Sequence, residues 1–452
     1  MKINTPLILC IWMCSYLFVL HAEAREIRDT TGVEYSVATW PGFKRSAVSI
    51  TFDDNYRFQI TKAMPLLNEH HFKATYFIVT NRVGKGWAPG WDTLNMVALQ
   101  GHEIGSHSVN HPNFAILSLN PLFADSMRRE FTDSRNTINA HIPSQQCETF
   151  AWPFGAVNPP AIVQAKQYYM ACRGSSNGYE STTPENYFNI YSQHIYHATP
   201  LEEVNTFIDN ILRAKGWLVE RWHGFKAGQD TNGYEPVPIG VFKSHLDYIA
   251  LNNDSLWVAP LNKVVKYMQE RENTVLHFFR NSPSEMTLSL TNWLPDTLFH
   301  YNVPLSLRIR FNDPGDRLGF ILQDNNPLPF TVRNFSGTNY YCFDAVPNRG
   351  LIHLRLAPDA VFNAGSGNEG YTGNYPNPFG LSTNVVFFLS EPEFVTVRVF
   401  NSWGIPLQDY SNRFLAGKNR VVIDGSSLQP GEYFCLVETA EKKSVFRLVR
   451  CF

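Results

Sequence analysis

The stretch Ala47-Val-Ser-Ile-Thr-Phe-Asp-Asp54 decides how the first half of this chain folds. Its apolar run predicts a strand over Val48–Phe52 that is buried on both faces, and two carboxylates follow at its end. In parallel α/β folds, functional side chains gather at the carboxyl ends of the strands. Adjacent side chains point in different directions, so one aspartate can bind metal while its neighbour faces a substrate. A helix N-cap with an acidic first turn is the alternative.

Two histidines four residues apart, His107 and His111, lie in the stretch Gly101-His-Glu-Ile-Gly-Ser-His-Ser-Val-Asn-His-Pro112. This spacing places two side chains on one face of a helical turn. Two imidazoles and one carboxylate form the ligand set of a catalytic zinc or similar ion, with a position open for water. A metal-free surface pair is the alternative, and we expect His102 and Glu103 to cap or pair locally. The pattern indicates a hydrolase in which one aspartate of the acidic pair binds the metal and the other acts as a base.

Two further strand ends carry candidate chemistry. The segment Ala151-Trp-Pro-Phe-Gly155 contains a Pro and a Gly that fix a sharp turn, which can aim a backbone N–H at a developing oxyanion. The segment Trp217–His223 predicts a strand that ends in a histidine suited to protonating a leaving group. A plain tight loop and a strand-capping histidine are the respective alternatives. We expect His194, His197 and His245 to have no catalytic role.

Strand and helix patterns alternate from about residue 47 to residue 277, which predicts a parallel α/β sheet or barrel. The expected elements are strands at Ala74–Val79 and Trp217–Trp222 and helices at Ile60–His70, Asp125–Ala140 and Leu201–Ala214. After residue 277, short alternating runs separated by Asn, Asp, Pro and Gly indicate antiparallel sandwiches. We therefore divide the chain into a signal peptide (1–24), an α/β domain (25–278), a β-sandwich (279–363), a linker (364–374) and a second β-sandwich (375–452).

The first residues predict export. Lys2 precedes an almost wholly apolar run over Pro6–Leu20, and Ala22-Glu-Ala24 fits a small-x-small cleavage site. Five cysteines remain after cleavage, and an oxidising compartment permits disulfides. Cys147 with Cys172 and Cys435 with Cys451 are the candidate pairs, with isolated buried thiols as the alternative. A formal net charge of -2 without long runs of one sign gives no indication of a nucleic-acid partner.

Taken in order, these motifs resemble those of the polysaccharide deacetylases, the family 4 carbohydrate esterases. The family's Thr-Phe-Asp-Asp stands at 51–54, and its His-Ser/Thr-x-x-His stands at 107–111. Its Arg-x-Pro-Tyr-Gly appears as Ala151-Trp-Pro-Phe-Gly155, and its strand-ending histidine matches His223. The resemblance spans roughly residues 46 to 272, and the joint presence of the first two motifs is highly specific.

The resemblance implies an α/β fold, a distorted (β/α) barrel with fewer than eight strands. It assigns metal binding to Asp54, His107 and His111, the base to Asp53, and the acid to His223. It also places Phe154 and Trp152 at the oxyanion and the substrate. Zinc is the expected divalent ion, with cobalt, nickel or manganese as alternatives.

Two departures from the family pattern affect the site. Asn55 replaces the glycine that usually follows the acidic pair, which is a mild change. Ala151 replaces the arginine that usually holds the catalytic aspartate, and losing such a partner costs about 10- to 100-fold in metal affinity or activity. We expect Arg173, at a neighbouring strand end, to supply that charge. The Asp-Trp motif that usually orients the acid histidine has no clear counterpart.

The tail carries a second resemblance. Asn374-Tyr-Pro-Asn-Pro-Phe379, Val399–Gly404 and Gly431-Glu-Tyr433 look like the C-terminal sorting domain of type IX secretion cargo. That resemblance implies the outer-membrane secretion machinery as a partner and a secreted or cell-surface location. A sandwich used only for binding or spacing is the alternative.

The sequence as a whole predicts a secreted, monomeric, metal-dependent hydrolase. It is expected to remove acetyl groups from a polysaccharide, with the N-acetyl groups of peptidoglycan- or chitin-like amino sugars as the preferred target. An O-acetyl esterase on xylan-like glycans is one rival. A carbohydrate-binding relative that kept the barrel and lost turnover is the other.

Overall fold

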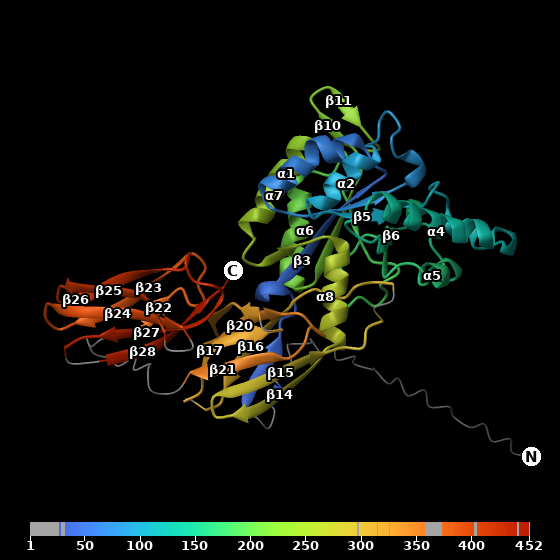
Figure 1. Ribbon diagram of the computed structural model, residues 1–452. Helices are drawn as coiled ribbons and strands as arrows, with labels where there is room; N and C mark the ends of the chain where they lie inside the picture. The colour runs from blue at the N-terminus through green and yellow to red at the C-terminus, as the bar shows by residue number, and fades with distance from the viewer. Residues whose placement is uncertain are drawn as a thin grey trace, which may run out of the picture.

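The computed structural model describes residues 27–28, 32–295, 298–313, 315–324, 326–357, 373–401, 405–440 and 443–451. The predicted signal peptide and most of the predicted linker lie outside the described residues. Three modules follow one another: an α/β domain, a β-sandwich packed beneath it, and a second sandwich to one side (Figure 1). Within these ranges, no helix combines the length and the apolar character needed to cross a membrane.

The α/β domain is built on one parallel sheet, in the order β7-β6-β5-β4-β3-β9-β8, with β13 paired to β3. Its strands are β3 (Ser46–Asp53), β4 (Thr75–Ile78), β5 (Glu103–Ser106), β6 (Thr149–Ala151), β7 (Ala171–Arg173), β8 (Gln193–His194), β9 (Trp217–Trp222) and β13 (Leu256–Val258). The structure confirms the expected distorted α/β barrel, but its sheet has eight strands rather than fewer. The segment that leads into β8 lies beside β7, with an isolated bridge between Arg173 and Ile190.

Helices cover the outer face of this sheet. They are α1 (Met64–Glu69), α2 (Trp91–Leu99), α3 (Phe114–Leu117), α4 (Ala124–His141), α5 (Pro159–Ala165), α6 (Leu201–Ala214), α7 (Ile239–Leu251) and α8 (Leu261–Asn273). α6 has the predicted bounds, because Val204, Ile208 and Ile211 bury one apolar stripe and Lys215 ends the helix at a φ of 60°. The predicted helix 60–70 is instead a π-helical turn followed by α1, and Pro65 stands in the first turn of α1.

The middle sandwich consists of two five-stranded antiparallel sheets, β1-β2-β16-β20-β19 and β14-β15-β21-β17-β18. The strands are β1 (Ile27–Arg28), β2 (Val33–Val37), β14 (Val275–Ser282), β15 (Glu285–Thr291), β16 (Leu305–Phe311), β17 (Arg317–Gln323), β18 (Asn326–Leu328), β19 (Phe330–Phe335), β20 (Thr338–Ala345) and β21 (Ile352–Ala357). β1 and β2 belong to the segment that the sequence assigns to the α/β domain. They differ from that expectation because β2 pairs with β16 over five residues and buries Val33 and Tyr35 in the sandwich core.

α8 joins this sandwich to the barrel. Tyr267 Oη donates to Ala38 O at 2.8 Å, and Arg271 Nη1 donates to Thr39 O at 2.7 Å. Val303 N donates to Glu270 Oε2 at 3.0 Å. These contacts lie at the end of the barrel where β3 begins, so the middle sandwich stays away from the strand ends that carry the candidate chemistry (Figure 1).

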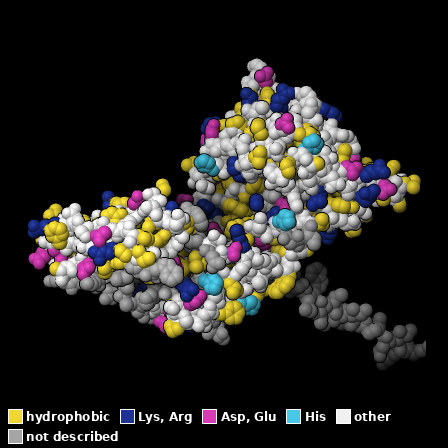
Figure 2. Space-filling view, in the orientation of Figure 1, with side chains coloured by type: hydrophobic (Ala, Val, Ile, Leu, Met, Phe, Trp, Pro, Cys, Tyr) yellow, Lys and Arg dark blue, Asp and Glu magenta, His cyan; other side chains and the backbone are white. Residues whose placement is uncertain are grey.

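The last module has two sheets, β22-β23-β26 and β25-β24-β27-β28. Its strands are β22 (Gly373–Tyr375), β23 (Ser382–Leu389), β24 (Glu393–Asn401), β25 (Pro406–Phe414), β26 (Gly417–Asp424), β27 (Gly431–Glu438) and β28 (Lys443–Arg450). β22 begins within the predicted linker, two residues before the expected boundary. Figure 2 shows basic and acidic side chains interspersed on the visible face of the molecule.

The described cysteines are free thiols, so neither predicted disulfide forms. Cys147 and Cys172 are fully buried, and burial raises the pKa of both thiols. Cys435 is buried in the core of the last sandwich, and Cys451 Sγ lies 3.2 Å from Phe379 O. The alternative of isolated thiols therefore describes this chain.

Candidate functional site

The acidic pair stands at the carboxyl end of β3, whose residues are all buried. Directly after the strand the chain turns sharply, with φ of 75° at Asp54 and 61° at Asn55. Asn55 holds this turn, because its side chain accepts from Val79 N at 2.8 Å and donates to Val79 O at 3.1 Å. Asparagine tolerates the left-handed region better than most residues. The turn therefore accepts Asn55 where the related family has glycine.

The two histidines follow the end of β5 in a second strained turn. Ser108 has a φ of 71° and His111 a φ of 62°, and His111 N donates to Ser108 Oγ at 2.8 Å. Glu130 of α4 holds this loop in place, because its Oε2 accepts hydrogen bonds from Val109 N and Asn110 N, each at 2.8 Å. Left-handed non-glycine residues cost about 1–3 kcal/mol each and cluster at functional sites. The loop is therefore held in a conformation that local preference alone would not give.

Asp54, His107 and His111 offer three ligand atoms that all lie within 4.8 Å of one another. His107 Nε2 lies 4.0 Å and His111 Nε2 lies 3.5 Å from Asp54 Oδ1. His107 Nδ1 bonds to Ala151 O at 2.8 Å, which leaves Nε2 to face the cluster. Burial lowers the pKa of His107 to about 3 and that of His111 to about 4, so both rings are neutral, as metal ligands must be. The donor set therefore fits a divalent ion.

Asp53 lies beside this cluster and has different partners. Arg173 Nη2 donates to Asp53 Oδ2, and His223 Nε2 lies 3.6 Å from the same oxygen. Burial alone would raise the pKa of Asp53, but the positive charge of Arg173 holds it below its usual range. Burial instead raises the pKa of Asp54. The two neighbouring carboxyl groups thus differ in environment, and Asp53 stays ionised at neutral pH.

Arg173 reaches Asp53 from β7, the strand next to the one that carries Ala151. β6 and β7 are parallel neighbours, and Ala151 is the register partner of Arg173. The arginine therefore stands one strand away from the position that Ala151 leaves without a charge, at the same level of the sheet. Its side chain is only 1% exposed. Removing one partner of such a buried pair leaves an uncompensated charge.

One predicted contact is wrong. Trp152 was expected at the substrate, but its side chain is 1% exposed, packs against Phe150 at 5.1 Å between ring centroids, and donates through Nε1 to Phe188 O. The period-two alternation of the strand turns this side chain into the core. The next turn exposes Phe154 instead, which is 69% exposed, has a φ of 58° and lies 4.4 Å from the His111 ring.

The sequence interpretation missed two residues that contact the cluster or its loop, Arg82 and Glu130. Arg82 Nη1 donates to Asp54 Oδ1, and its guanidinium lies 5.9 Å from the centroid of the Trp87 ring. No motif signals this arginine, which lies after β4. A signal did exist for Glu130, since it is the acidic residue on the buried face of α4, together with Met127 and Phe131.

Three other polar residues of the barrel have structural partners. His102 Nδ1 accepts from Ala74 N at 3.1 Å, and Glu103 accepts from the hydroxyls of Thr75 and Thr149. His245 is fully buried and lies 2.7 Å from a carboxylate oxygen of Glu220. They lie outside the metal cluster, as expected.

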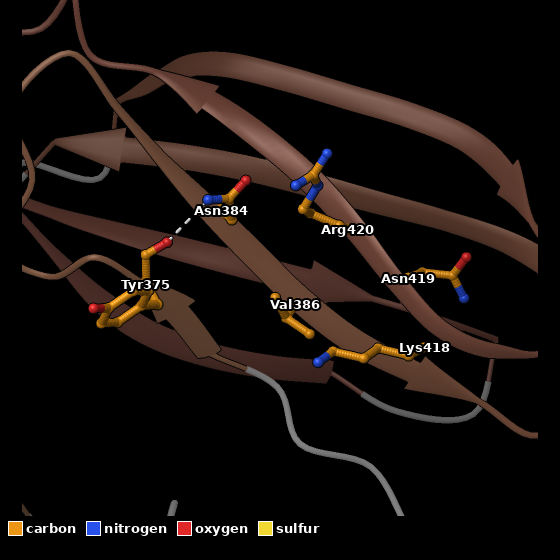
Figure 3. A pocket seen from close by; sticks show the side chains of 6 residues that line it. All are labelled: Tyr375, Asn384, Val386, Lys418, Asn419 and Arg420. Atoms are coloured by element: carbon orange, nitrogen blue, oxygen red, sulfur yellow. Dashed lines mark hydrogen bonds between the residues drawn. The ribbon is translucent and has the colours of Figure 1, made fainter.

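A hollow of about 510 Å³ opens on the outer face of the last sandwich (Figure 3). Its side chains come from β22, β23 and β26, and they are Tyr375, Asn384, Val386, Lys418, Asn419 and Arg420. Because this hollow lies in a different module, it contributes no residue to the cluster around Asp54.

Comparison with known proteins identifies two parts of the chain. Residues 41–172 match the polysaccharide deacetylase family model, and residues 374–450 match the secretion system C-terminal sorting domain. A gellan lyase from a Bacillus species is 28% identical over 346 residues, which is 72% of this chain and 13% of that protein. A peptidoglycan-N-acetylglucosamine deacetylase from Bacillus cereus is 32% identical over 107 residues, or 24% of this chain and 36% of that protein.

Among solved structures, a family 4 acetyl xylan esterase from Clostridium thermocellum, in complex with a cobalt ion, is 18% identical. The match covers 50% of this chain and 91% of that structure, with a TM-score of 0.36. The chain spans well under half of the length of the gellan lyase and of the peptidoglycan-N-acetylglucosamine deacetylase. Residues 41–172 therefore belong to a domain of the polysaccharide deacetylase family, and residues 374–450 form a type IX secretion sorting domain.

Proposed function

We propose that this protein is an exported, metal-dependent hydrolase that removes acetyl groups from a polysaccharide. The observation that carries the proposal is the arrangement at the strand ends: three ligand atoms within 4.8 Å, beside a second aspartate that pairs with Arg173 and faces His223. The family match and the resemblance to a peptidoglycan-N-acetylglucosamine deacetylase support an N-acetylated amino sugar as substrate.

Asp54, His107 and His111 would hold the ion, with zinc as the preferred occupant and cobalt, nickel or manganese as alternatives. A divalent ion at this position supplies Lewis-acid polarisation of the acetyl carbonyl and eases the ionisation of water. Because Phe154 lies against His111 at the open edge of the cluster, its backbone N–H is the candidate donor to the oxyanion.

Asp53 acts as the base in this proposal. It is ionised at neutral pH, and its Oδ1 is buried without a hydrogen-bond partner among the described residues, so it is available to accept a proton. His223 Nε2 lies 3.6 Å from Oδ2, so a proton taken up by Asp53 can pass to His223. His223 then releases a proton to the departing amine or hydroxyl.

The sorting domain indicates export, and the outer-membrane secretion machinery is its proposed partner. We infer that a signal peptide starts this route and that the protein acts as a monomer in secreted or surface-bound form. An O-acetyl esterase on xylan-like glycans is the second candidate, because the same tetrahedral chemistry serves esters and amides.

The test is acetate release by the mature protein from chitin oligomers, peptidoglycan and acetylated xylan, with and without chelator. His107→Ala is the inactive variant, and His300→Ala, on an exposed loop of the middle module, is the matched control. Release that requires both metal and His107 supports the proposal, and the responding glycan selects amide or ester. A protein that binds metal and glycan but releases no acetate would instead be the non-catalytic binding relative.

A further inference from the structure

The candidate acid His223 lies against polar residues that the proposed chemistry does not use. Its Nδ1 is buried and has no hydrogen-bond partner within the described parts of the chain. The ring of His194 lies 5.4 Å away between centroids, at 74° to the ring of His223. His194 Nε2 in turn lies 3.2 Å from Glu235 Oε2, and neither of these two buried atoms makes a hydrogen bond among the described residues. A buried polar atom without a partner is rare enough in a folded protein to require a reason.

The fold places His194 and Glu235 beside His223 by two separate routes. β8 runs parallel to β9, and His194 is the register partner of Arg221, two residues before His223. Glu235 lies in the loop that follows β11 (Asp230–Asn232). This loop is held next to His223 because Gly224 N donates to Tyr234 O at 2.9 Å. A Cβ at Gly224 would lie 2.7 Å from backbone atoms of this loop, so only glycine allows the approach.

The backbone at Glu235 is strained. Its φ is 42°, in the left-handed region, where a non-glycine residue costs about 1–3 kcal/mol. Such a conformation persists only when the surroundings impose it, and here it accompanies a carboxylate facing His194. Burial, with the nearby charge of Arg221, lowers the pKa of His194 to about 4, so the ring is neutral at neutral pH. A neutral imidazole that donates from Nε2 to a carboxylate has Nδ1 as an acceptor.

We propose that His194 and Glu235 form a positioning pair for His223, in which Glu235 fixes the tautomer of His194 and His194 accepts from His223 Nδ1. The proposal rests on the function proposed above, because it takes His223 as the acid. It gives His223 the partner that the missing Asp-Trp motif would otherwise provide. Catalytic hydrogen bonds are often long without substrate and tighten in the complex, which accommodates the present separation.

The first test measures the tautomer of His223 and needs no turnover. Nitrogen-15 shifts of the two ring nitrogens, in metal-free protein at neutral pH, are expected to place the proton on Nδ1. His194→Phe keeps a ring but removes the acceptor, so the proton should move to Nε2, where Asp53 is 3.6 Å away. Glu235→Gln should move the proton of His223 in the same direction. Because Glu235 is only half-buried, this substitution should leave the protein folded. His197→Phe, an exposed neighbour, is the matched control and should match the wild type.

The second test is kinetic. His194→Phe and Glu235→Gln should lower kcat by about 10- to 100-fold with KM within about twofold, because the pair acts on proton delivery and not on binding. His194→Gln keeps an acceptor and should recover part of the loss.

An unchanged tautomer in His194→Phe, a wild-type proton already on Nε2, or wild-type kcat in both variants would overturn the positioning pair. If the wild-type protein releases no acetate from any glycan, the proposed function fails. The tautomer measurement still decides the contact between the two histidines in that case.

Discussion

Replacing Arg173 with methionine tests the assignment of the base most directly. Both members of the Arg173–Asp53 pair are at least 97% buried by side chain, and burial by itself raises the pKa of Asp53. At an effective dielectric constant of about 20, a pair about 4 Å apart interacts with about 4 kcal/mol. Since one pH unit corresponds to about 1.4 kcal/mol, the pKa of Asp53 should rise by as much as about three pH units in Arg173→Met.

The sign of this shift gives the assay. A base works only when deprotonated, so kcat/KM falls as the pH drops through its pKa. The wild type should show no acidic limb from Asp53 in the accessible range, whereas Arg173→Met should show one that has moved towards neutrality. The assay is the pH dependence of kcat/KM for acetate release. Arg213→Met, on the exposed face of α6, is the matched control.

Stability provides an independent check on the same pair. Because the pKa of Asp53 is lower in the folded state, the pair stabilises the fold above the unfolded pKa of about 4, and this contribution is lost as the pH falls below it. Arg173→Met should therefore lose about 3–5 kcal/mol at pH 7, and Asp53→Asn in the same chain should restore part of it. A pH profile of Arg173→Met that superimposes on the wild-type profile, together with unchanged stability, would refute the reasoning.

Three further outcomes follow from the described contacts. His111→Ala should lose the divalent ion in calorimetric titration, whereas Asp53→Asn should retain it and lose turnover; wild-type activity in Asp53→Asn would remove Asp53 as the base. Burial raises the pKa of Glu103 from 4.5 to about 7. The contribution of the protonated Glu103 side chain to the free energy of unfolding is therefore complete below pH 4.5. Up to about 3 kcal/mol of this stability is lost as the pH rises from there through 7. Urea unfolding of Glu103→Gln should lack this fall between pH 5 and pH 8, and an equal fall would contradict it. Val33→Ala should destabilise the middle sandwich by about 1–3 kcal/mol in thermal unfolding, and no loss would place β2 outside that core.

The parts of the fold that were predictable from the sequence depend on local patterns. The bounds of β9 and α6 agree with the prediction because their signals lie within the segments themselves: an apolar run for the strand, and buried residues at helical spacing for the helix. Strand–helix alternation predicted a parallel α/β sheet or barrel, and the parallel sheet is confirmed. Pairing between distant segments has no such local signal, so β2 was assigned to the wrong side of the boundary.

The residues of the candidate site differ in the same way: local motifs predict some of them, and the others depend on contacts between distant segments. Residues at strand ends, such as Asp54 and His107, could be proposed because a motif gives both residue type and position. Arg82 could not, since its role depends on where the loop after β4 returns to Asp54. Trp152 shows the converse, because it lies within a motif and yet its side chain points into the core.

The replacement of the family arginine by Ala151 bears on whether this domain retains catalysis. Taken from the motif alone, the loss favours a binding protein without turnover. The register pairs Ala151 with Arg173, however, and parallel neighbours end at one level, so a charge on either strand can reach the same carboxylate. The guanidinium at Asp53 is thus a property of the sheet edge and not of one motif. The loss of the motif arginine argues against catalysis only when no neighbouring strand end places another positive charge beside the catalytic aspartate. Here Arg173 places such a charge beside Asp53.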